Sequence, residues 1–276
     1  MTSIGKKIRM ERIFDRISKN TIIVPMIHGV SVGPVKGIVD MSKAVDKVAR
    51  RGANAVALNK DDVPTGHRGR GRDVGLIVHM SSSTKFADEP NDRGIVCSVK
   101  EAVSLGADAV SIYVNLENGN EGQVLEKFAT IVDQSNEYGM PLLAMVYPRG
   151  SKAEKGKEYD AENVGHCAQV ADELGVDIVN VNYTGSPETF RYVVDACKIP
   201  VLISDGPNMG SEKELLEMVE GAMMAGAAGI SIGRNVFQRD DLTTIVGKMS
   251  KIVHKVAHVE DFYPEKDGET RSFWGD

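Results

Sequence analysis

The chain has 276 residues, of which 42% are hydrophobic and 26% are charged, and its formal net charge is −6. This length suits one large domain, the composition is ordinary for a soluble globular protein, and the acidic balance gives no general attraction to nucleic acid or anionic lipid. The first residues, MTSIGKKIRMERIF, lack the apolar core of a secretory signal, and the longest apolar runs are too short to cross a bilayer. We therefore expect a cytoplasmic protein with no membrane and no nucleic-acid partner.

The cysteines and acidic residues give little sign of a metal or redox site. Cys97, Cys167 and Cys197 are odd in number and lack metal-ligand spacing, which favours reduced thiols in the core. No cluster of His, Asp or Glu has convincing ligand spacing, and only Asp205 with His28 leaves a metal open. We expect no metal and no other cofactor.

Short apolar runs follow one another along the chain, beginning after a helical lead-in. The first predicted strand is TIIVPMIHG, residues 21–29, and three others are GLIVHM from Gly75, PLLAMVYP from Pro141 and PVLISDGP from Pro200. Four further segments resemble one another, because each begins with a glycine suited to ending a helix and continues into a β-branched strand. They are GANAVAL from Gly52, GADAVSI from Gly106, GVDIVNV from Gly175 and GAAGISI from Gly226.

Amphipathic helical patterns alternate with these runs. Three apolar stripes are Met41, Ala44, Val45 and Val48; Leu215, Leu216, Val219 and Met223; and Ile245, Val246, Met249, Ile252, Val253 and Val256. Eight strands alternating with helices predict a single-domain α/β fold, the (β/α)8 TIM barrel, over residues 1–258, with a polar tail over 259–276. An open doubly wound sheet is the alternative, but no GxGxxG follows the first strand.

Two loop segments carry unusual side chains. The loop TGHRGRGRD, residues 65–73, holds Arg68, Arg70 and Arg72, which suits a lid that attracts an anionic substrate better than a polynucleotide site. The tail contains four aromatic residues, and docking and disorder are equally open for it. These aromatic residues are Phe262, Tyr263, Phe273 and Trp274.

Polar residues gather where the predicted strands end. Asn180 and Asn182 are two residues apart and therefore lie on the same side of one strand, and alignment of the four similar segments places small or polar residues at the equivalent positions. The equivalents are Ala57 and Asn59, Ser111 and Tyr113, and Ser231 and Gly233, while the other strands end in Ile27 and His28, Tyr147 and Arg149, and Asp205 and Gly206. A single buried Asn is more often satisfied by neighbouring backbone, but so many polar residues at one mouth predict a ligand site.

The last two predicted strands end in loops suited to a phosphate. SDGP, residues 204–207, and SIGRN, residues 231–235, offer glycines for close backbone approach together with Arg234. Asp205 opposes this interpretation, because a carboxylate repels a phosphate unless it is protonated or paired.

Several of these motifs resemble one family in order along nearly the whole chain. VPMIHGVSVGP, GHRGRGRDVGL, GADAVSI, VYPRG, NYTG and GAAGISIGRNVFQ are similar to the archaeal-type (DhnA-like) class I aldolases, which include 2-amino-3,7-dideoxy-D-threo-hept-6-ulosonate synthase and fructose-bisphosphate aldolase class I. The resemblance implies a (β/α)8 barrel, Schiff-base aldol or transaldol chemistry on a phosphorylated sugar, and a homo-oligomer. It also implies a proton-donor tyrosine at Tyr147 and a phosphate-binding pair at Gly233 and Arg234.

The resemblance does not extend to the position of the family's catalytic nucleophile. The family's imine-forming lysine stands two residues before the residue that precedes Tyr-Thr-Gly, and here that position is Asn180. The family's acidic residue before the first His-Gly is Ile27, and one of its two glycines after the seventh strand is Asp205. An amide nitrogen cannot form an imine, because its lone pair is delocalised into the carbonyl, so the family mechanism cannot run from this position. Lys60 lies just past the second strand, where a supporting electrostatic role is favoured over an imine.

These observations predict an aldolase-family enzyme that acts on a small, phosphorylated sugar-like or keto substrate by aldol-type or enolisation chemistry without the Schiff base. The alternative is an inactive paralogue that binds a sugar phosphate or regulates an active homologue; ordinary aldol chemistry on Lys60 is a third possibility. The candidate catalytic residues are Tyr147, Asp205, His28, Asn180 and Lys60. The candidate substrate-binding residues are Ile27, Gly29, Ser31, Asn59, Arg149, Asn182, Gly206, Gly233 and Arg234.

Overall fold

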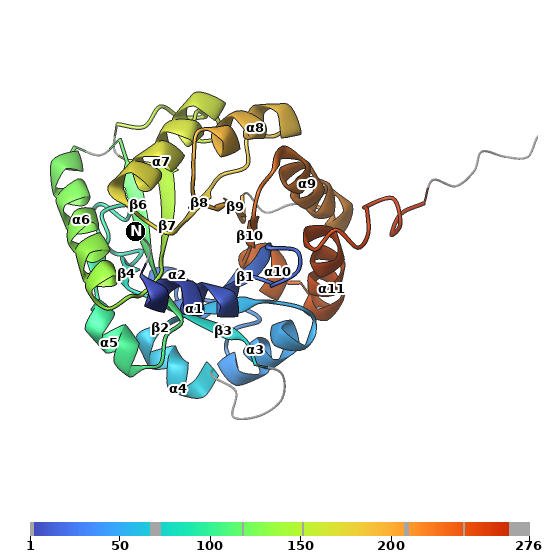
Figure 1. Cartoon of the computed structure of the whole chain (residues 1–276), viewed down its shortest axis with the longest axis horizontal. Coiled ribbons are helices and arrows are strands. Elements are labelled where there is room, and N and C mark those ends of the chain that lie inside the picture. The colour runs from blue at the N-terminus through green and yellow to red at the C-terminus, as the bar shows by residue number, and fades with distance from the viewer. Residues whose placement is uncertain are drawn as a thin grey trace, which may run out of the picture.

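The computed structural model describes residues 3–66, 73–117, 119–150, 152–206, 210–239 and 241–264. Its centre is a closed barrel of parallel strands in the order β1-β10-β9-β8-β7-β6-β3-β2 (Figure 1). The strands are β1(Thr21–Pro25), β2(Ala55–Asn59), β3(Gly75–His79), β6(Ala109–Leu116), β7(Leu142–Pro148), β8(Ile178–Val181), β9(Val201–Ser204) and β10(Gly229–Ser231). The predicted single-domain (β/α)8 barrel is confirmed.

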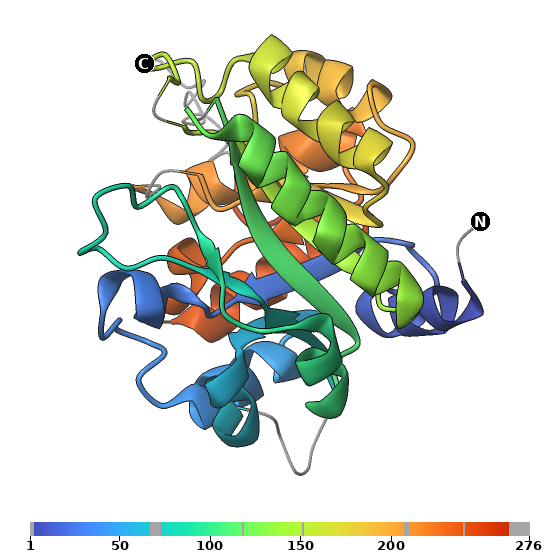
Figure 2. The same cartoon turned by 90° about the vertical axis from the view of Figure 1, so that its left-hand side faces the viewer.

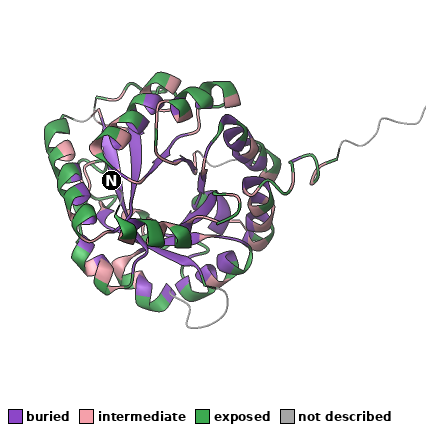
Figure 3. Cartoon of the chain, in the orientation of Figure 1, coloured by how far each residue is buried: buried purple, intermediate pink, exposed green. Residues whose placement is uncertain are grey.

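Helices surround this barrel, and the longer ones turn their apolar faces toward it, so that buried and exposed residues alternate along them (Figure 3). The longer ones are α3(Met41–Arg50), α5(Val99–Ser104), α6(Glu121–Glu137), α7(Ala161–Leu174), α8(Pro187–Asp195), α9(Glu212–Ala225) and α11(Leu242–Val253). The shorter ones are α2(His28–Val32), η1(Lys60–Asp62), α4(Val63–Gly66) and α10(Arg234–Phe237). The expected stripes on α3, α9 and α11 are buried, except that Val256 follows the end of α11 and is 74% exposed.

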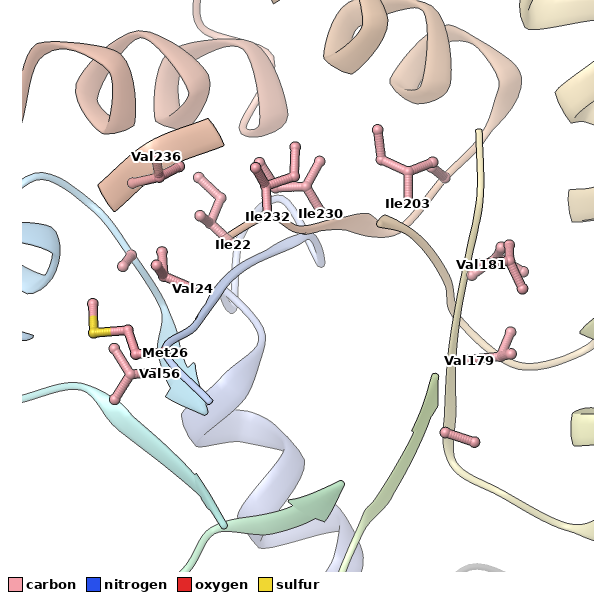
Figure 4. Packing of buried hydrophobic residues seen from close by; sticks show 14 of the residues in the cluster. Ile22, Val24, Met26, Val56, Val179, Val181, Ile203, Ile230, Ile232 and Val236 are labelled. Atoms are coloured by element: carbon pink, nitrogen blue, oxygen red, sulfur yellow. The ribbon is translucent and has the colours of Figure 1, made fainter. Parts of the chain in front are cut away.

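Two apolar layers separate the inside of the barrel from the helices. Alternate strand residues such as Val179, Val181 and Ile203 point outward and pack against the helices (Figure 4). The residues between them, including Ile178 and Leu202, form a second cluster that fills the barrel. This alternation follows from the period of two in a strand, and it places Asn180 on the inward side.

The amino-terminal helix α1(Ile4–Ile13) closes one end of the barrel. Ile13 is fully buried and belongs to the interior cluster, and the hydroxyl of Thr21 donates to its carbonyl at 2.7 Å. Lys6 is also buried, and its Nζ lies 2.7 Å from a carboxylate oxygen of Asp177. A site in this barrel must therefore open at the other end, where the strands finish.

A short insertion follows β3 at that open end. It consists of β4(Ser81–Ser82) and β5(Gly94–Ile95), which pair antiparallel, and the segment between them projects from the body of the molecule opposite α1 (Figure 2). Arg93, which precedes β5, donates to the hydroxyl of Ser31 in α2 at 3.3 Å. The insertion is thereby tied to the loop that follows β1.

No helix in the described part of the chain is both long enough and apolar enough to span a membrane.

Candidate functional site

The open end of the barrel holds a pocket that encloses about 430 Å³, part of it continuous with solvent. Inward-facing residues from six strands and the loops after them line it, as the alternation of inward and outward positions requires. The lining residues are Pro25, His28, Tyr113, Met145, Tyr147, Arg149, Asn180, Ser204, Asp205, Gly206, Ser231 and Arg234. The structure thus brings half of the expected site residues, seven of fourteen, into the lining of one pocket.

Asn180 and Tyr147 form the floor of this pocket. Asn180 is 1% exposed, and its Nδ2 donates to the Tyr147 hydroxyl across 3.1 Å. Its Oδ1 is buried and has no hydrogen-bond partner among the residues that the structure describes, and the same is true of Ser231 Oγ and His28 Nδ1. Buried polar atoms are nearly always paired, so three such atoms around one pocket make it suitable for a polar ligand or ordered water.

The protonation states of two lining residues suit them to neutral acid–base chemistry. Burial lowers the pKa of His28 to about 4, helped by the charges of Arg234 and Arg93, so its imidazole is neutral at pH 7. Burial raises the pKa of Tyr147, with Tyr113 as a further cause, so its hydroxyl keeps its proton. A neutral imidazole can accept a proton and a phenol can donate one.

Asp205 lies in the pocket wall, but its carboxylate accepts hydrogen bonds from the residues that follow β10. Oδ2 accepts from the backbone N–H of Arg234 at 2.6 Å, and Oδ1 accepts from the backbone and side-chain nitrogens of Asn235, both at 3.1 Å. Burial raises the pKa of Asp205, while these bonds oppose the rise. These hydrogen bonds make Asp205 a cap on this loop, and its catalytic role stays a prediction.

Two other polar residues at the mouth are held by several contacts. Asn182 donates to the carbonyl of Glu158 at 2.8 Å, and its Oδ1 accepts from Ser204 at 3.0 Å and from Arg149 at 3.4 Å. The Arg149 guanidinium also lies 4.7 Å from the centre of the Tyr147 ring. Asn182 therefore orients Arg149 and the wall of the pocket.

Lys60 is one of several expected site residues that lie outside the lining. Its Nζ is 3.1 Å from a carboxylate oxygen of Glu101, and this contact raises the pKa of Lys60. A protonated, paired amine is a poor nucleophile, so the geometry does not support an imine there. No lysine is among the described residues that line the pocket.

Six further expected substrate-binding residues, Asn182 among them, are also absent from the lining. Ile27 is buried in the interior cluster, and Asn59 donates to Asp62 at 3.3 Å. Gly29 is exposed on α2, and Ser31 accepts from Arg93. Gly233 is also absent from the lining, but a side chain there would meet the carbonyl of Pro25 at 2.5 Å, so it permits close packing of the loop that bears Arg234. The arginines of the 65–73 loop and the aromatic residues Phe273 and Trp274 lie outside the described residues.

Arg93, His79 and the stacking role of Tyr113 were not expected from the sequence. The Arg93 guanidinium lies 4.1 Å from the centre of the Tyr113 ring, and Tyr113 in turn lies 5.9 Å from Tyr147, between ring centres. His79 packs edge-on against Tyr113, and burial lowers its pKa to about 3. His79 falls in the inward column of β3, so strand alternation alone could have found it, whereas Arg93 follows an irregular segment that carries no such pattern.

With this geometry established, comparison with known proteins decides the family. A model described as "DeoC/LacD family aldolase" matches residues 21–239, which run from β1 to beyond α10. The chain belongs to this family.

Relatives of known name extend the similarity over nearly the whole chain. The chain is 42% identical over 258 residues to 2-amino-3,7-dideoxy-D-threo-hept-6-ulosonate synthase 1 of Archaeoglobus fulgidus, with 94% of each chain covered. It is 33% identical over 250 residues to 2-amino-4,5-dihydroxy-6-oxo-7-(phosphonooxy)heptanoate synthase of Streptomyces griseus, with 91% of this chain and 90% of that one covered. The aldolase resemblance seen in the sequence is confirmed at the level of the family.

Solved structures of aldolases also superpose on this chain. An archaeal fructose 1,6-bisphosphate aldolase superposes with a TM-score of 0.81 at 34% identity, covering 91% of this chain and 99% of that one. Another archaeal structure, with a TM-score of 0.80 and 34% identity over the same shares, has its catalytic lysine covalently bound to the carbinolamine intermediate of its substrate. The family therefore contains members that work through a covalent lysine.

Proposed function

We propose that this chain is an aldolase-family enzyme that acts on a small phosphorylated keto or sugar-like substrate without a Schiff base on β8. The observation that supports it is the Asn180–Tyr147 hydrogen bond at the floor of a pocket with no lysine among its described lining residues. The phosphorylated substrate is carried over from relatives such as the (phosphonooxy)heptanoate synthase. The two arginines in the lining are consistent with an anionic ligand.

The pocket suggests enolisation as the shared first step. A substrate carbonyl oxygen accepts a hydrogen bond from the Tyr147 hydroxyl, which is itself made a better donor because Asn180 donates to its oxygen. Neutral His28 accepts the proton from the carbon next to that carbonyl, and the negative charge passes to the oxygen facing Tyr147. The resulting enolate can attack an aldehyde, and the new alkoxide then takes the proton back from the imidazolium.

Trapping with borohydride distinguishes this proposal from imine chemistry. The protein is incubated with a ketose phosphate and sodium borohydride, and intact and peptide masses are measured alongside turnover. We expect turnover that persists after borohydride treatment, no added mass on any lysine, and a loss of about 10²-fold or more in kcat for Tyr147→Phe. A covalent adduct on a lysine that accounts for the activity would contradict the proposal.

One observation favours the alternative of a non-catalytic binding protein. The Asp205 carboxylate occupies backbone and amide donors at the end of β10, in the loop where this fold usually binds phosphate. A protein that binds a sugar phosphate yet gives no product with any ketose and aldehyde pair, as wild type or as Asp205→Gly, would support that alternative.

A further inference from the structure

A second hollow lies outside the barrel, between the start of α8 and α9, and encloses about 1280 Å³, part of it open to solvent. The volume of this groove is about three times the 430 Å³ of the pocket at the barrel mouth. Aromatic and methionine side chains form much of its lining, including Tyr159, Tyr183, Met218 and Met224. Met224 is 64% exposed although it is apolar. An exposed apolar hollow of this size is typical of a surface that contacts another segment or molecule.

The floor of the groove depends on a glycine inside α9. A Cβ atom at Gly221 would overlap the hydroxyl oxygen of Tyr183 and would lie 3.6 Å from Cγ of Pro187. Glycine inside a helix is less stable than alanine, so this position keeps a residue that the helix alone disfavours. Gly221 allows the Tyr183 ring, which packs on Phe190 at 5.3 Å between ring centres, to lie directly against α9. The groove is therefore shaped by specific side-chain packing.

The carboxyl-terminal tail leaves the body of the protein beside this groove. His258 Nδ1 lies 2.8 Å from a carboxylate oxygen of Glu220, which also lines the groove. Phe262 and Tyr263 then pack against the apolar core, and the Tyr263 hydroxyl donates to Glu212 at 2.7 Å. Since α9 lies between α8 and α11, the tail runs along α9 from Glu220 to the first residue of the helix (Figure 1).

The rest of the tail is long enough to enter the groove. Twelve residues, EKDGETRSFWGD, follow Pro264, the last residue that the structure describes. Their only large apolar side chains are Phe273 and Trp274. The eight residues between Pro264 and Phe273 can span roughly 26 Å when extended, whereas α9 with its 14 residues is about 21 Å long. Every part of the groove wall on α9 therefore lies within reach.

We propose that the groove binds Phe273 and Trp274 of its own chain and thereby ties the carboxyl terminus across α9. Their rings match the lining, because tyrosine rings and methionine thioethers make favourable contacts with aromatic rings. The Glu217 carboxylate also lines the groove, and Arg271 stands two residues before Phe273, so the tail brings a cation to an acidic rim. Gly206 lines both the groove and the pocket at the barrel mouth, so the bound tail lies against the loop after β9. This contact is independent of any catalytic activity of the chain.

Trp274 is the only tryptophan in the chain, so its fluorescence reports on this contact alone. The emission spectrum of the full-length protein is compared with that of a synthetic peptide of residues 265–276. We expect emission at shorter wavelength in the protein, because the indole leaves water for an apolar groove. Phe273→Ser removes one of the two anchors and should shift the emission back toward that of the peptide.

Two substitutions of exposed apolar residues test whether the groove is the place of binding. Met224→Glu puts a charge into the groove, and we expect it to move the Trp274 emission to that of the free peptide. Val39→Glu is the matched control, since Val39 is 80% exposed and lies outside the groove lining, and it should leave the emission of the wild type unchanged. The melting temperature of each variant is measured to show that the barrel remains folded.

A crosslink identifies the chain whose tail occupies the groove. Met224→Cys and Ser272→Cys are combined with Cys197→Ser, because the other two cysteines are buried. Under mild oxidation we expect a disulfide between residues 224 and 272, seen as a crosslinked peptide from a band of monomer mass. Val39→Cys with Ser272→Cys should give no crosslink.

The proposal is overturned if Trp274 emits as it does in the free peptide, or if Met224→Glu leaves its emission unchanged. A crosslink at the mass of two chains, or none between residues 224 and 272, would also overturn it. Emission at shorter wavelength that is lost in Met224→Glu, with a crosslink at monomer mass, would establish the contact whether or not the chain has turnover.

Discussion

Asn180 reaches across from β8 to Tyr147 on β7, and the two side chains meet at 3.1 Å. In the register of the sheet Asn180 lies opposite Met145, so Tyr147 is one inward position nearer the mouth and the contact is diagonal. The pair links a neutral amide to a buried phenol whose pKa is raised by burial. This relationship gives Asn180 a role that does not depend on nucleophilicity.

Asn180→Ala should therefore separate activity from stability. We expect kcat to fall by about 10²-fold, since the Tyr147 hydroxyl loses the amide that polarises it. Stability should change by less than about 1 kcal/mol, because the variant loses one hydrogen bond but also removes a buried oxygen that has no partner. Urea unfolding and steady-state kinetics on the same samples measure the two effects.

The matched control is Asn182→Ala. Asn182 directly follows β8 and lies two residues after Asn180. Asn182 is also 1% exposed, but its amide makes three contacts to Glu158, Ser204 and Arg149. Its loss leaves these groups unpaired and should cost about 2 kcal/mol of unfolding free energy. Equal destabilisation by the two substitutions would contradict the interpretation that the Asn180 oxygen awaits a ligand.

The lowered pKa of His28 predicts that the stability of the protein depends on pH. Its pKa is lowered from 6.5 to about 4 in the folded chain, so between these values the unfolded state binds a proton that the folded state does not. Stability must therefore fall as the pH is lowered through this window. His28→Gln removes one titrating group, and we expect the slope of unfolding free energy against pH to be shallower by up to about one proton.

The control for this measurement is His166→Gln, at an exposed position on α7. It makes the same substitution away from the pocket, so its slope shows the effect of a His-to-Gln change that leaves His28 in place. If the two variants have the same slope, His28 is not held neutral in the folded protein.

Placing a lysine on β8 tests whether the pocket can support an imine. In Asn180→Lys with Ile27→Asp, the new amine occupies a buried inward position, where desolvation should lower its pKa and leave part of it uncharged. We expect borohydride and a ketose phosphate to add mass at residue 180 in the double variant. The single variant Asn182→Lys, made on the same wall, should remain unmodified.

The architecture and the floor of the site could be predicted from the sequence because both follow from the period of two in β-strands. The spacing of Asn180 and Asn182, and of Ser111 and Tyr113, fixes which side chains face inward once a closed barrel is recognised. Asp205 could not be assigned in this way. It follows the last residue of β9, where the chain leaves the sheet and Gly206 takes φ +62, so strand alternation no longer governs its direction.

Arg93 and Lys6 were missed for a different reason. Arg93 reaches the Tyr113 ring from a short antiparallel insertion with no apolar pattern of its own, and its position depends on contacts with Ser31 and Tyr113 from distant parts of the chain. Lys6 lies on a charged helix that looks solvent-exposed in the sequence, but its amine is buried against Asp177. Pairings over such long separations have no local signal.

Lys60→Met should leave catalysis nearly intact. The Lys60 amine is paired with Glu101 and lies outside the residues that line the pocket, so we expect kcat/KM to stay within about twofold of the wild type. The pair is partly exposed, so its loss should change stability little. A hundredfold loss of turnover in this variant would show that Lys60 takes part in catalysis.

The ion pair that closes the base of the barrel should be among the costliest to break. Lys6 is 3% exposed, and Asp177 also accepts from the backbone N–H of Leu142 at 2.9 Å, so the carboxylate ties α1 to β7 as well. Lys6→Met leaves this charge without its cation and should lower the unfolding free energy by about 3 kcal/mol. Lys43→Met breaks an ion pair with Asp40 that is largely in solvent, and it should lower the unfolding free energy far less than Lys6→Met does. Because the Lys6 pair lies at the end of the barrel opposite the pocket, the Lys6 variant should keep its kcat below its melting temperature; loss of kcat without loss of stability would show that α1 shapes the site as well as closing the barrel.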